Sequence, residues 1–402
     1  MSVTKPTELA VPPSLDDDRD YALDDMPDLH QRLSALRERS PAAWVKSFGR
    51  PAVMFTSYAL VDAAFKDEET FPSKAFYADV VTDVLGYNIQ CMYGAEHRRN
   101  RALASPAFRQ RLVSELITPL LEPVAHELID RFEARGEADL VAQYTQRYPF
   151  SIILRMLGLP SASEDLVARW ALGMLDIQQN YAHAVECSRE FTAFVAPILA
   201  QRRTEPAGDL ISKLATEEVD GERLTDDEIM NFLKLLFPAG SDTTYLGLGN
   251  ALYGLLTHPD QLELVTADLQ GQARWAAEEG LRWEAPVALL PRHNPQDVVW
   301  NDVAIPADTP LIFAIVAANR DPAKFDDPER FDVRRRPTGT LTFGFGQHFC
   351  LGAHLARAEM EISLKVLLSR LPGLRIADDP GARIGATFAQ MLRGPNRLPV
   401  RF

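Results

Sequence analysis

Apolar residues recur every three or four positions through most of the chain between Glu96 and about Leu256. This spacing is typical of amphipathic helices. Proline and glycine residues divide the pattern into separate segments. We predict helices over residues 97–103, 112–133, 144–157, 163–177, 182–202 and 209–214.

The longest predicted helix begins at Thr225. The stretch Thr225-Asp226-Asp227-Glu228 has the form of a capping box, in which the threonine and glutamate side chains satisfy the first backbone N–H groups. The apolar pattern then extends to about Leu256, and Pro259 stops it. Two shorter helices, over residues 262–269 and 272–283, lead to Pro286.

The regions before and after these helices have a different spacing of apolar residues. Near the N-terminus the pattern predicts a hairpin of strands 44–46 and 52–56 between short helices at 29–37 and 61–65. Residues 76–92 have no clear period, so we expect a long loop there. After Pro286, short strands are predicted at 288–292, 297–300 and 310–315, then coil to Arg336, a helix from Ala353 to Leu371, and strands in the last 30 residues.

These elements indicate a mainly α fold with a smaller β region, of the α+β class. Residues 1–20 are polar and acidic, and we expect them to be disordered. No repeat or linker interrupts the remainder, so residues 21–402 are predicted to form a single domain.

Composition narrows the cellular setting. The net charge of −14 makes nucleic acid an unsuitable partner. The three cysteines, Cys91, Cys187 and Cys350, are far apart, which favours a reducing compartment. The first 20 residues do not resemble a signal peptide, and no apolar stretch is long enough to span a bilayer. We therefore expect a cytoplasmic protein with no membrane association.

One cysteine stands in a distinctive loop. Residues 343–352 read FGFGQHFCLG, with Cys350 just before the helix that starts at Ala353. The glycines let the backbone approach a flat group, and the helix N-terminus favours thiolate over thiol. A single thiolate suits heme iron, whose in-plane ligands come from the porphyrin. A lone cysteine after a loop is, however, more often a small buried apolar residue.

The loop resembles the heme-binding loop of the cytochrome P450 superfamily, the heme-thiolate monooxygenases. The resemblance implies heme b (iron protoporphyrin IX) with Cys350 as the iron ligand, and His348 bound to a heme propionate. It further implies a triangular-prism fold with heme between the long helix and the cysteine-loop helix. The other cofactor contacts that it implies in this loop are Phe343, Gly344 and Gly352.

A second motif interrupts the longest predicted helix. Residues 238–244 read PAGSDTT, and an interior glycine and proline cost a helix about 1 and about 3 kcal/mol. A proline-kinked core helix explains the segment as well as a site does. The segment also resembles the oxygen-activating motif of the same superfamily, with Pro238 as a departure. By that resemblance Asp242 relays protons, Thr243 binds the oxygen substrate, and Ala239 and Gly240 contact the cofactor.

Two further groups of charged residues have ordinary explanations as solvated surface pairs. Glu279 and Arg282 resemble the superfamily's ExxR motif, and Arg330 belongs to a PERF segment that resembles its partner; the implied role is structural. His97, Arg101 and Arg292 match the positions that bind heme propionates. The resemblance also names candidate substrate-pocket residues: Phe237, Val287, Ala288, Leu289 and Phe388. By the same resemblance, the segments 76–92, 174–181, 287–290 and 387–390 are expected in the pocket walls.

The implied function is a monooxygenase that inserts one atom of O2 into a small, mostly apolar organic molecule. Its electrons are expected from NAD(P)H through ferredoxin reductase and a ferredoxin, which we expect to dock on Arg98, Arg99, Arg109 and Arg111. The enzyme is expected to be a monomer. Two alternatives are a peroxide-driven peroxygenase of the same fold, and a heme-based sensor or electron carrier, which would need no proton relay.

Overall fold

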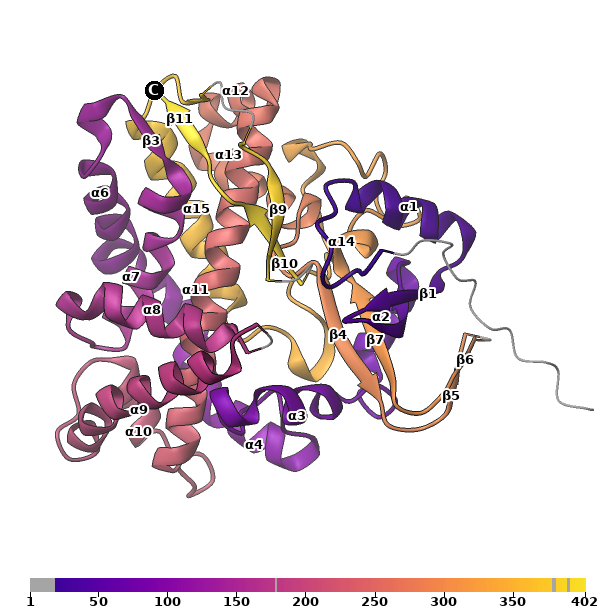
Figure 1. Ribbon diagram of the computed structural model, residues 1–402. Coiled ribbons are helices and arrows are strands. Elements are labelled where there is room, and N and C mark those ends of the chain that lie inside the picture. Colours follow the sequence, from indigo (N-terminus) through magenta and orange to yellow (C-terminus); the bar gives the residue numbers. More distant parts are fainter. Residues whose placement is uncertain (1–18, 178, 302, 378–380, 389–390) are drawn as a thin grey trace, which may run out of the picture.

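A computed structural model describes residues 19–177, 179–301, 303–377, 381–388 and 391–402. The long helix α11 (Asp226–Thr257) runs through the molecule, and other helices pack around it (Figure 1). Its start is the predicted capping box: the Thr225 hydroxyl accepts from the Glu228 N–H, and the Glu228 carboxylate accepts from the Thr225 N–H. The helix continues through Pro238.

The fold is mainly α with a smaller β region, as the sequence predicts. The other helices are α1 (Leu29–Arg39), α2 (Tyr58–Lys66), α3 (Ser73–Leu85), α4 (Gly94–Ala104), α5 (Gln110–Glu115), α6 (Glu122–Asp130), α7 (Arg147–Met156), α8 (Glu164–Leu175), α9 (Tyr181–Thr204), α10 (Leu210–Thr216), α12 (Pro259–Ala267), α13 (Leu269–Trp283), α14 (Ile315–Ala318) and α15 (Ala353–Arg370). Among the described residues, none of these helices combines the length and the apolar character needed to cross a bilayer.

The central position of α11 follows from its sequence. Apolar side chains surround nearly the whole helix, so it is buried on most sides. Its C-terminal half shares a hydrophobic core with α6, α13 and α15, and its N-terminal half shares another with α3, α7, α8 and α9. A Cβ atom on Gly280 would lie 2.5 Å from the Cβ of Ala251, so this glycine lets α13 approach α11 closely.

The main sheet lies to one side of the helical part, together with α1 and α2 (Figure 1). Its strand order is β1-β2-β7-β4, in which only the β2–β7 pair is parallel. The described strands are β1 (Ala42–Ser47), β2 (Arg50–Phe55), β3 (Glu137–Asp139), β4 (Leu289–Asn294), β5 (Val298–Trp300), β6 (Val303–Ile305), β7 (Thr309–Ala314), β8 (Arg375–Ile376), β9 (Ile384–Phe388), β10 (Leu392–Pro395) and β11 (Pro399–Arg401).

Two local predictions are wrong. The long loop expected at residues 76–92 contains most of α3, whose apolar face is wide because it borders both a core and a cavity. The single helix expected over residues 112–133 is two helices, α5 and α6, joined by a π-helical turn that contains Pro119, which has no N–H to donate. The short strand β3, which pairs with β11, lies between the helices predicted over residues 112–133 and 144–157 and was not predicted.

Most of the predicted disordered segment lies outside the described residues. Asp20, at its end, is buried and accepts hydrogen bonds from the backbone N–H groups of Ala22, Phe48 and Gly49. The N-terminal segment is therefore joined to the β1–β2 turn from this residue onward.

Candidate functional site

The cysteine loop is shaped by two glycines in the left-handed region of backbone conformation. Gly344 has φ +68° and Gly346 has φ +74°, and a Cβ on Gly346 would lie 2.6 Å from the carbonyl oxygen of Phe65. The Cys350 N–H donates to the Phe343 carbonyl at 2.9 Å, which closes the loop on itself. Cys350 therefore stands three residues before Ala353, the first residue of α15.

Groups around Cys350 act on the pKa of its thiol in opposite directions. Desolvation raises this pKa, whereas the N–H groups of Gly352 and Ala353 and the charges of Arg101 and Arg357 lower it. The Cys350 side chain is exposed to the cavity that it lines, and a bound cation that replaces the thiol proton would favour the thiolate.

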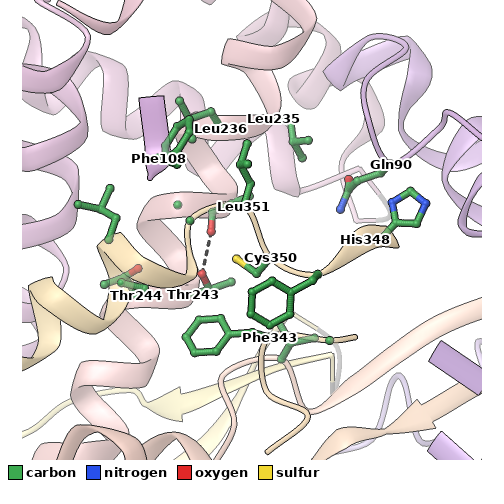
Figure 2. Close-up of a pocket in the computed structure, with 18 of the residues that line it drawn as sticks. Gln90, Phe108, Leu235, Leu236, Thr243, Thr244, Phe343, His348, Cys350 and Leu351 are labelled. Carbon is green, nitrogen blue, oxygen red and sulfur yellow. Dashed lines mark hydrogen bonds between the residues drawn. The ribbon is translucent and has the colours of Figure 1, made fainter. Parts of the chain in front are cut away.

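Cys350 lines a cavity of about 280 Å³ between the cysteine loop and α11, which we call the cysteine cavity. In Figure 2 the Cys350 sulfur lies between Phe343 of the loop and Thr243 of α11. The predicted cofactor residues that line this cavity are Arg101, Ala239, Gly240, Thr243, Arg292, Phe343, Gly344, His348, Cys350 and Gly352. His97 is absent from this lining, but its ring lies 4.2 Å from that of His348, centroid to centroid.

One edge of the cysteine cavity collects the basic side chains. His97 is buried, and neither of its ring nitrogens has a hydrogen-bond partner among the described residues. Burial, with smaller contributions from His348 and Arg101, lowers its pKa to about 4. Arg101 donates to the Phe349 carbonyl at 2.6 Å, and the guanidinium of the buried Arg292 lies 5.6 Å from the Tyr77 ring centroid.

This edge fits an anionic group. Two arginines face the cavity, and a buried imidazole lacks a partner, which an incoming acceptor would provide. His348 already has one partner, because its Nε2 lies 3.1 Å from a Glu68 carboxylate oxygen. The residues therefore suit the two propionates of a heme, with Cys350 lining the same cavity.

On α11, the acid and the alcohol have different surroundings. Asp242 is 1% exposed, and neither of its carboxylate oxygens has a partner among the described residues. Burial raises the pKa of this carboxyl to about 7. The Thr243 hydroxyl donates to the Ala239 carbonyl at 2.7 Å, an interaction drawn in Figure 2, while its side chain faces the cysteine cavity.

A larger cavity, of about 620 Å³, adjoins the first. The residues that line both are Tyr77, Gln90, Leu235, Ala239, Thr243, Val287 and Leu290. Asp242 lines only this larger cavity. Its walls come from distant parts of the chain: the segment 22–25, α3, the end of α8, α11, β4 and the β9–β10 hairpin.

Of the predicted pocket residues whose side chains the structure describes, one lines the cavities and three do not. Val287 lines both cavities, whereas Phe237, Ala288 and Leu289 line neither. Phe237 packs in the core, with its ring 5.8 Å from Phe150, and Ala288 and Leu289 are buried against the main sheet. The pocket assignment of these three residues is therefore corrected. Phe388 ends β9, but its side chain is outside the described part of the structure.

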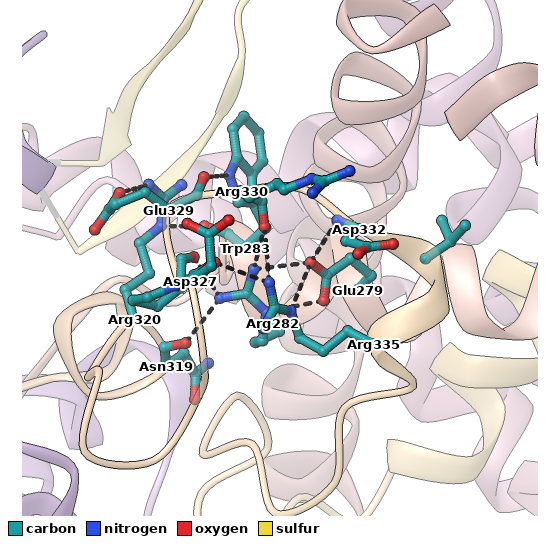
Figure 3. A network of polar contacts seen from close by, with 12 residues as sticks. Glu279, Arg282, Trp283, Asn319, Arg320, Asp327, Glu329, Arg330, Asp332 and Arg335 are labelled. Atoms are coloured by element: carbon teal, nitrogen blue, oxygen red, sulfur yellow. Dashed lines mark hydrogen bonds and ion pairs between the residues drawn. The ribbon is translucent and has the colours of Figure 1, made fainter. Parts of the chain in front are cut away.

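The ExxR pair lies in a buried network (Figure 3). The Glu279 and Arg282 side chains are 0% exposed and form a two-bonded ion pair, with both distances 2.8 Å. Arg282 also donates to the carbonyls of Asn319, Pro328 and Arg330. The expected Arg330 side chain is exposed and takes no part; Arg335 supplies the second cation, with its Nε 3.3 Å from a Glu279 oxygen.

Several site residues escaped the sequence reasoning. Asp24, Asp25, Phe48 and Arg383 form part of the larger cavity. The helical period of Phe76, Tyr77 and Val80 was a usable signal for α3. Nothing local to residues 22–25 or 383 indicates that they approach α11, because that proximity depends on the assembled fold.

Comparisons with known proteins agree with these observations. Residues 23–158 and 172–372 match the family model described as Cytochrome P450. The chain is 33% identical to 6-deoxyerythronolide B hydroxylase of Saccharopolyspora erythraea, with 93% of this chain and 96% of that protein covered. It is 34% identical to mycinamicin IV hydroxylase/epoxidase of Micromonospora griseorubida, with 92% and 94% covered.

Solved structures give the same result. The structure of cytochrome P450 CYP109Q5 from Chondromyces apiculatus has a TM-score of 0.86 and 32% identity, over 93% of this chain and 95% of that one. The cytochrome P450 PksS of Bacillus subtilis has a TM-score of 0.84 and 30% identity, over 93% and 97%.

Proposed function

Because the chain belongs to the cytochrome P450 family, and so to the monooxygenases of that class, we propose that it hydroxylates, or oxidises in a related way, a mostly apolar organic molecule. The observation that carries this proposal is the cysteine cavity. The Cys350 thiol and the Thr243 side chain both line it, together with the guanidinium groups of Arg101 and Arg292.

Heme b is the proposed cofactor, with Cys350 as the iron ligand and Arg101, Arg292, His97 and His348 around the propionates. When bound, the heme iron activates O2, and a thiolate ligand favours cleavage of the O–O bond. The arginines and His97 orient the group by charge and hydrogen bonding. Phe343 and Cys350 of the loop both line the cavity (Figure 2).

Asp242 and Thr243 are the proposed proton carriers. A carboxyl with a pKa of about 7 exchanges its proton readily at neutral pH, which suits a relay acid. The Thr243 hydroxyl donates its proton to the Ala239 carbonyl, and its oxygen keeps lone pairs that accept from a donor in the cavity. The adjoining larger cavity holds the substrate, with Val287 and Leu290 where the two cavities meet.

The network of Glu279, Arg282 and Arg335 positions the cysteine loop and does not touch the cavities. Arg282 reaches the Asn319 carbonyl, and the Asn319 side chain binds the N–H of Leu341 and the hydroxyl of Thr342, directly before Phe343. This chain of contacts fixes the start of the loop that carries Cys350.

Electrons are proposed to come from NAD(P)H through ferredoxin reductase and a ferredoxin. The docking surface expected for the ferredoxin needs revision. Arg99 pairs with Glu222 and Glu228, and Arg111 pairs with Glu115, so the charges of these two arginines are already compensated. Arg98 and Arg109 remain exposed beside α4, which contacts the cysteine loop through Arg101. We expect the double variant Arg98→Gln, Arg109→Gln to slow reduction by a ferredoxin severalfold at low salt, with little effect at high salt. Arg169→Gln, an exposed arginine on α8, is the control; equal reduction rates in both variants would reject the dock.

The proposed function is tested by the origin of the inserted oxygen atom. With a reconstituted redox chain and ¹⁸O₂, one labelled oxygen atom is expected in the product. Turnover that requires hydrogen peroxide and takes no label from ¹⁸O₂ would instead indicate a peroxygenase. Thr243→Ala separates the two further, because a peroxide brings its own protons and oxygen–oxygen bond and depends less on the relay.

A further inference from the structure

Glu68, just after α2, joins two elements at the edge of the cysteine cavity. Its Oε1 lies 3.1 Å from Nε2 of His348 and accepts from the N–H of Ser73, the first residue of α3, at 2.7 Å. A carboxylate only accepts hydrogen bonds, so Nε2 of His348 is the donor. The Glu68 and His348 side chains are 11% and 13% exposed. One mostly buried carboxylate oxygen therefore ties the cysteine loop to α3.

The turn that carries Glu68 is held by its own hydrogen bonds. The Asp67 carboxylate accepts from the Thr70 N–H at 3.0 Å and from the Thr70 hydroxyl at 2.7 Å. The Phe71 N–H donates to the Asp67 carbonyl at 3.0 Å, and the Phe71 side chain is buried. The backbone at Glu68 is consequently fixed on both sides, between α2 and α3.

The cysteine loop meets this turn through close backbone packing. A Cβ on Gly346 would lie 2.6 Å from the Phe65 carbonyl oxygen, so the loop passes directly over the end of α2. The contact between Glu68 and His348 thus depends on two packed backbones and is unlike a pair of long surface side chains. His348 and Ser73 line the cysteine cavity, but Glu68 does not. Glu68 can therefore act on a ligand in that cavity only through these two residues.

Both elements that Glu68 joins carry neighbours of the basic edge. On the loop, the His348 ring lies 4.2 Å from the ring of the buried His97, centroid to centroid. On the first turns of α3, Tyr77 lies beside Arg292, whose guanidinium is 5.6 Å from the Tyr77 ring centroid. Glu68 is consequently placed to hold the histidine side and the arginine side of this edge at a fixed separation.

We propose that Glu68 is a positioning residue of the heme site, which holds the His348 ring in place for a heme propionate and fixes the start of α3 at the same edge. A side chain that is already held in its binding position loses less freedom when the ligand binds, so the ligand is bound more tightly. This inference rests on the proposed function, in which heme b is the cofactor, and it adds a residue that lies outside the sequence motifs.

The test measures how fast the purified heme-loaded protein releases heme to an excess of apomyoglobin. Glu68→Ala removes the acceptor, and release should become about tenfold faster. Glu68→Gln keeps an acceptor oxygen at the same reach, so its release rate should stay within about twofold of that of the unaltered protein. Glu69→Ala is the matched control, because Glu69 is the next acid along the chain, is exposed and does not line the cavity. It should leave the release rate unchanged.

Two further variants separate positioning from charge and from a general loss of stability. Glu68→Asp keeps the charge but is one methylene shorter, so release should be severalfold faster; this variant carries the test if Glu68→Ala loses its helical content. Because Glu68 acts through His348, Glu68→Ala should accelerate release little further in a His348→Ala background. Additive effects of these two substitutions would overturn the inference, as would equal release rates from Glu68→Asp, Glu68→Gln and Glu69→Ala.

The outcome also separates this inference from the proposed function. Each variant is first reduced and treated with carbon monoxide, which reports thiolate-ligated heme. A set of variants that all show thiolate-ligated heme and release it at one rate contradicts only the role of Glu68. An unaltered protein that binds no thiolate-ligated heme contradicts the proposed function itself.

Discussion

The cysteine cavity and the larger cavity differ in how the chain builds them. The first takes its thiol, Cys350, and its hydroxyl group, Thr243, from two short stretches, residues 342–352 and 239–244, and a buried ion network holds the start of the cysteine loop. The second takes its walls from many separate segments between Ala22 and Asn396. The first cavity is thus built to hold one cofactor. In the second cavity, substitution of a single wall residue can change which substrate binds. The predictions below test that contrast.

The largest effect on stability is expected when an acid is removed from the buried ion network. Glu279→Ala leaves the Arg282 guanidinium buried without its carboxylate, which costs about 3–5 kcal/mol of unfolding free energy. Urea unfolding followed by circular dichroism measures it. Glu127→Ala is the control, because this exposed acid also pairs with arginines and should cost under about 1 kcal/mol. Equal losses of unfolding free energy in the two variants would show that the buried network stabilises the fold no more than an exposed ion pair does.

Adjacent leucines on β4 sharpen the contrast at the larger cavity. Leu289→Ala opens a hole in the core and should lower the unfolding free energy by about 2–5 kcal/mol. Leu290→Ala should cost less stability but shift the dissociation constant of an apolar ligand several-fold, because Leu290 faces both cavities. Denaturant unfolding and spectral titration of both variants measure this. A larger stability loss in Leu290→Ala together with a larger binding change in Leu289→Ala would contradict the placement of Leu290 in the cavity wall.

Asp242 links stability to pH. Its folded-state pKa of about 7 lies above the usual 3.8, so the folded protein holds a proton that the unfolded chain releases between these values. Stability from this group is therefore fully present below about pH 4 and is lost as the pH rises through 7. Asp242→Asn should stabilise the ligand-free protein at pH 8 by on the order of 3 kcal/mol, and little at pH 4. Thermal unfolding at both pH values tests this, and an equal change at both would contradict it.

The smallest changes in stability are expected for Arg335 and Arg330, two arginines near Glu279. Arg335→Ala removes a contact to the buried Glu279 and should cost about 1–3 kcal/mol. Arg330→Ala should change stability by less than about 0.5 kcal/mol, since its exposed side chain is outside the network and its carbonyl is retained. Parallel unfolding curves of the two variants decide the matter. A greater loss for Arg330→Ala would restore the role first expected for it.

The same contrast explains what could be predicted from the sequence. The cysteine loop, the capping box at Thr225 and the Glu279–Arg282 pair are local patterns, whose chemistry depends on residues a few positions apart. The structure brings the cysteine loop and the Asp242–Thr243 segment to one cavity through the packing of α11 beside α15, which the sequence predicts only as two long helices.

The rest depends on which way a side chain points after assembly. Leu289 and Leu290 are equally apolar, and only the register of β4 against β7 turns one toward the core and the other toward the cavities. Arg330 and Arg335 are both near Glu279 in the fold, but the backbone between them decides which guanidinium reaches it. α3 escaped prediction because its apolar residues serve a core on one side and a cavity on the other.

The account rests most directly on the bond between the Cys350 sulfur and iron, which carbon monoxide added to the reduced protein reports. We predict the red-shifted Soret band of thiolate-ligated heme, and its loss in Cys350→Ser with the helical content retained. The same band in Cys350→Ser, or its absence from the unaltered protein loaded with heme, would contradict the account.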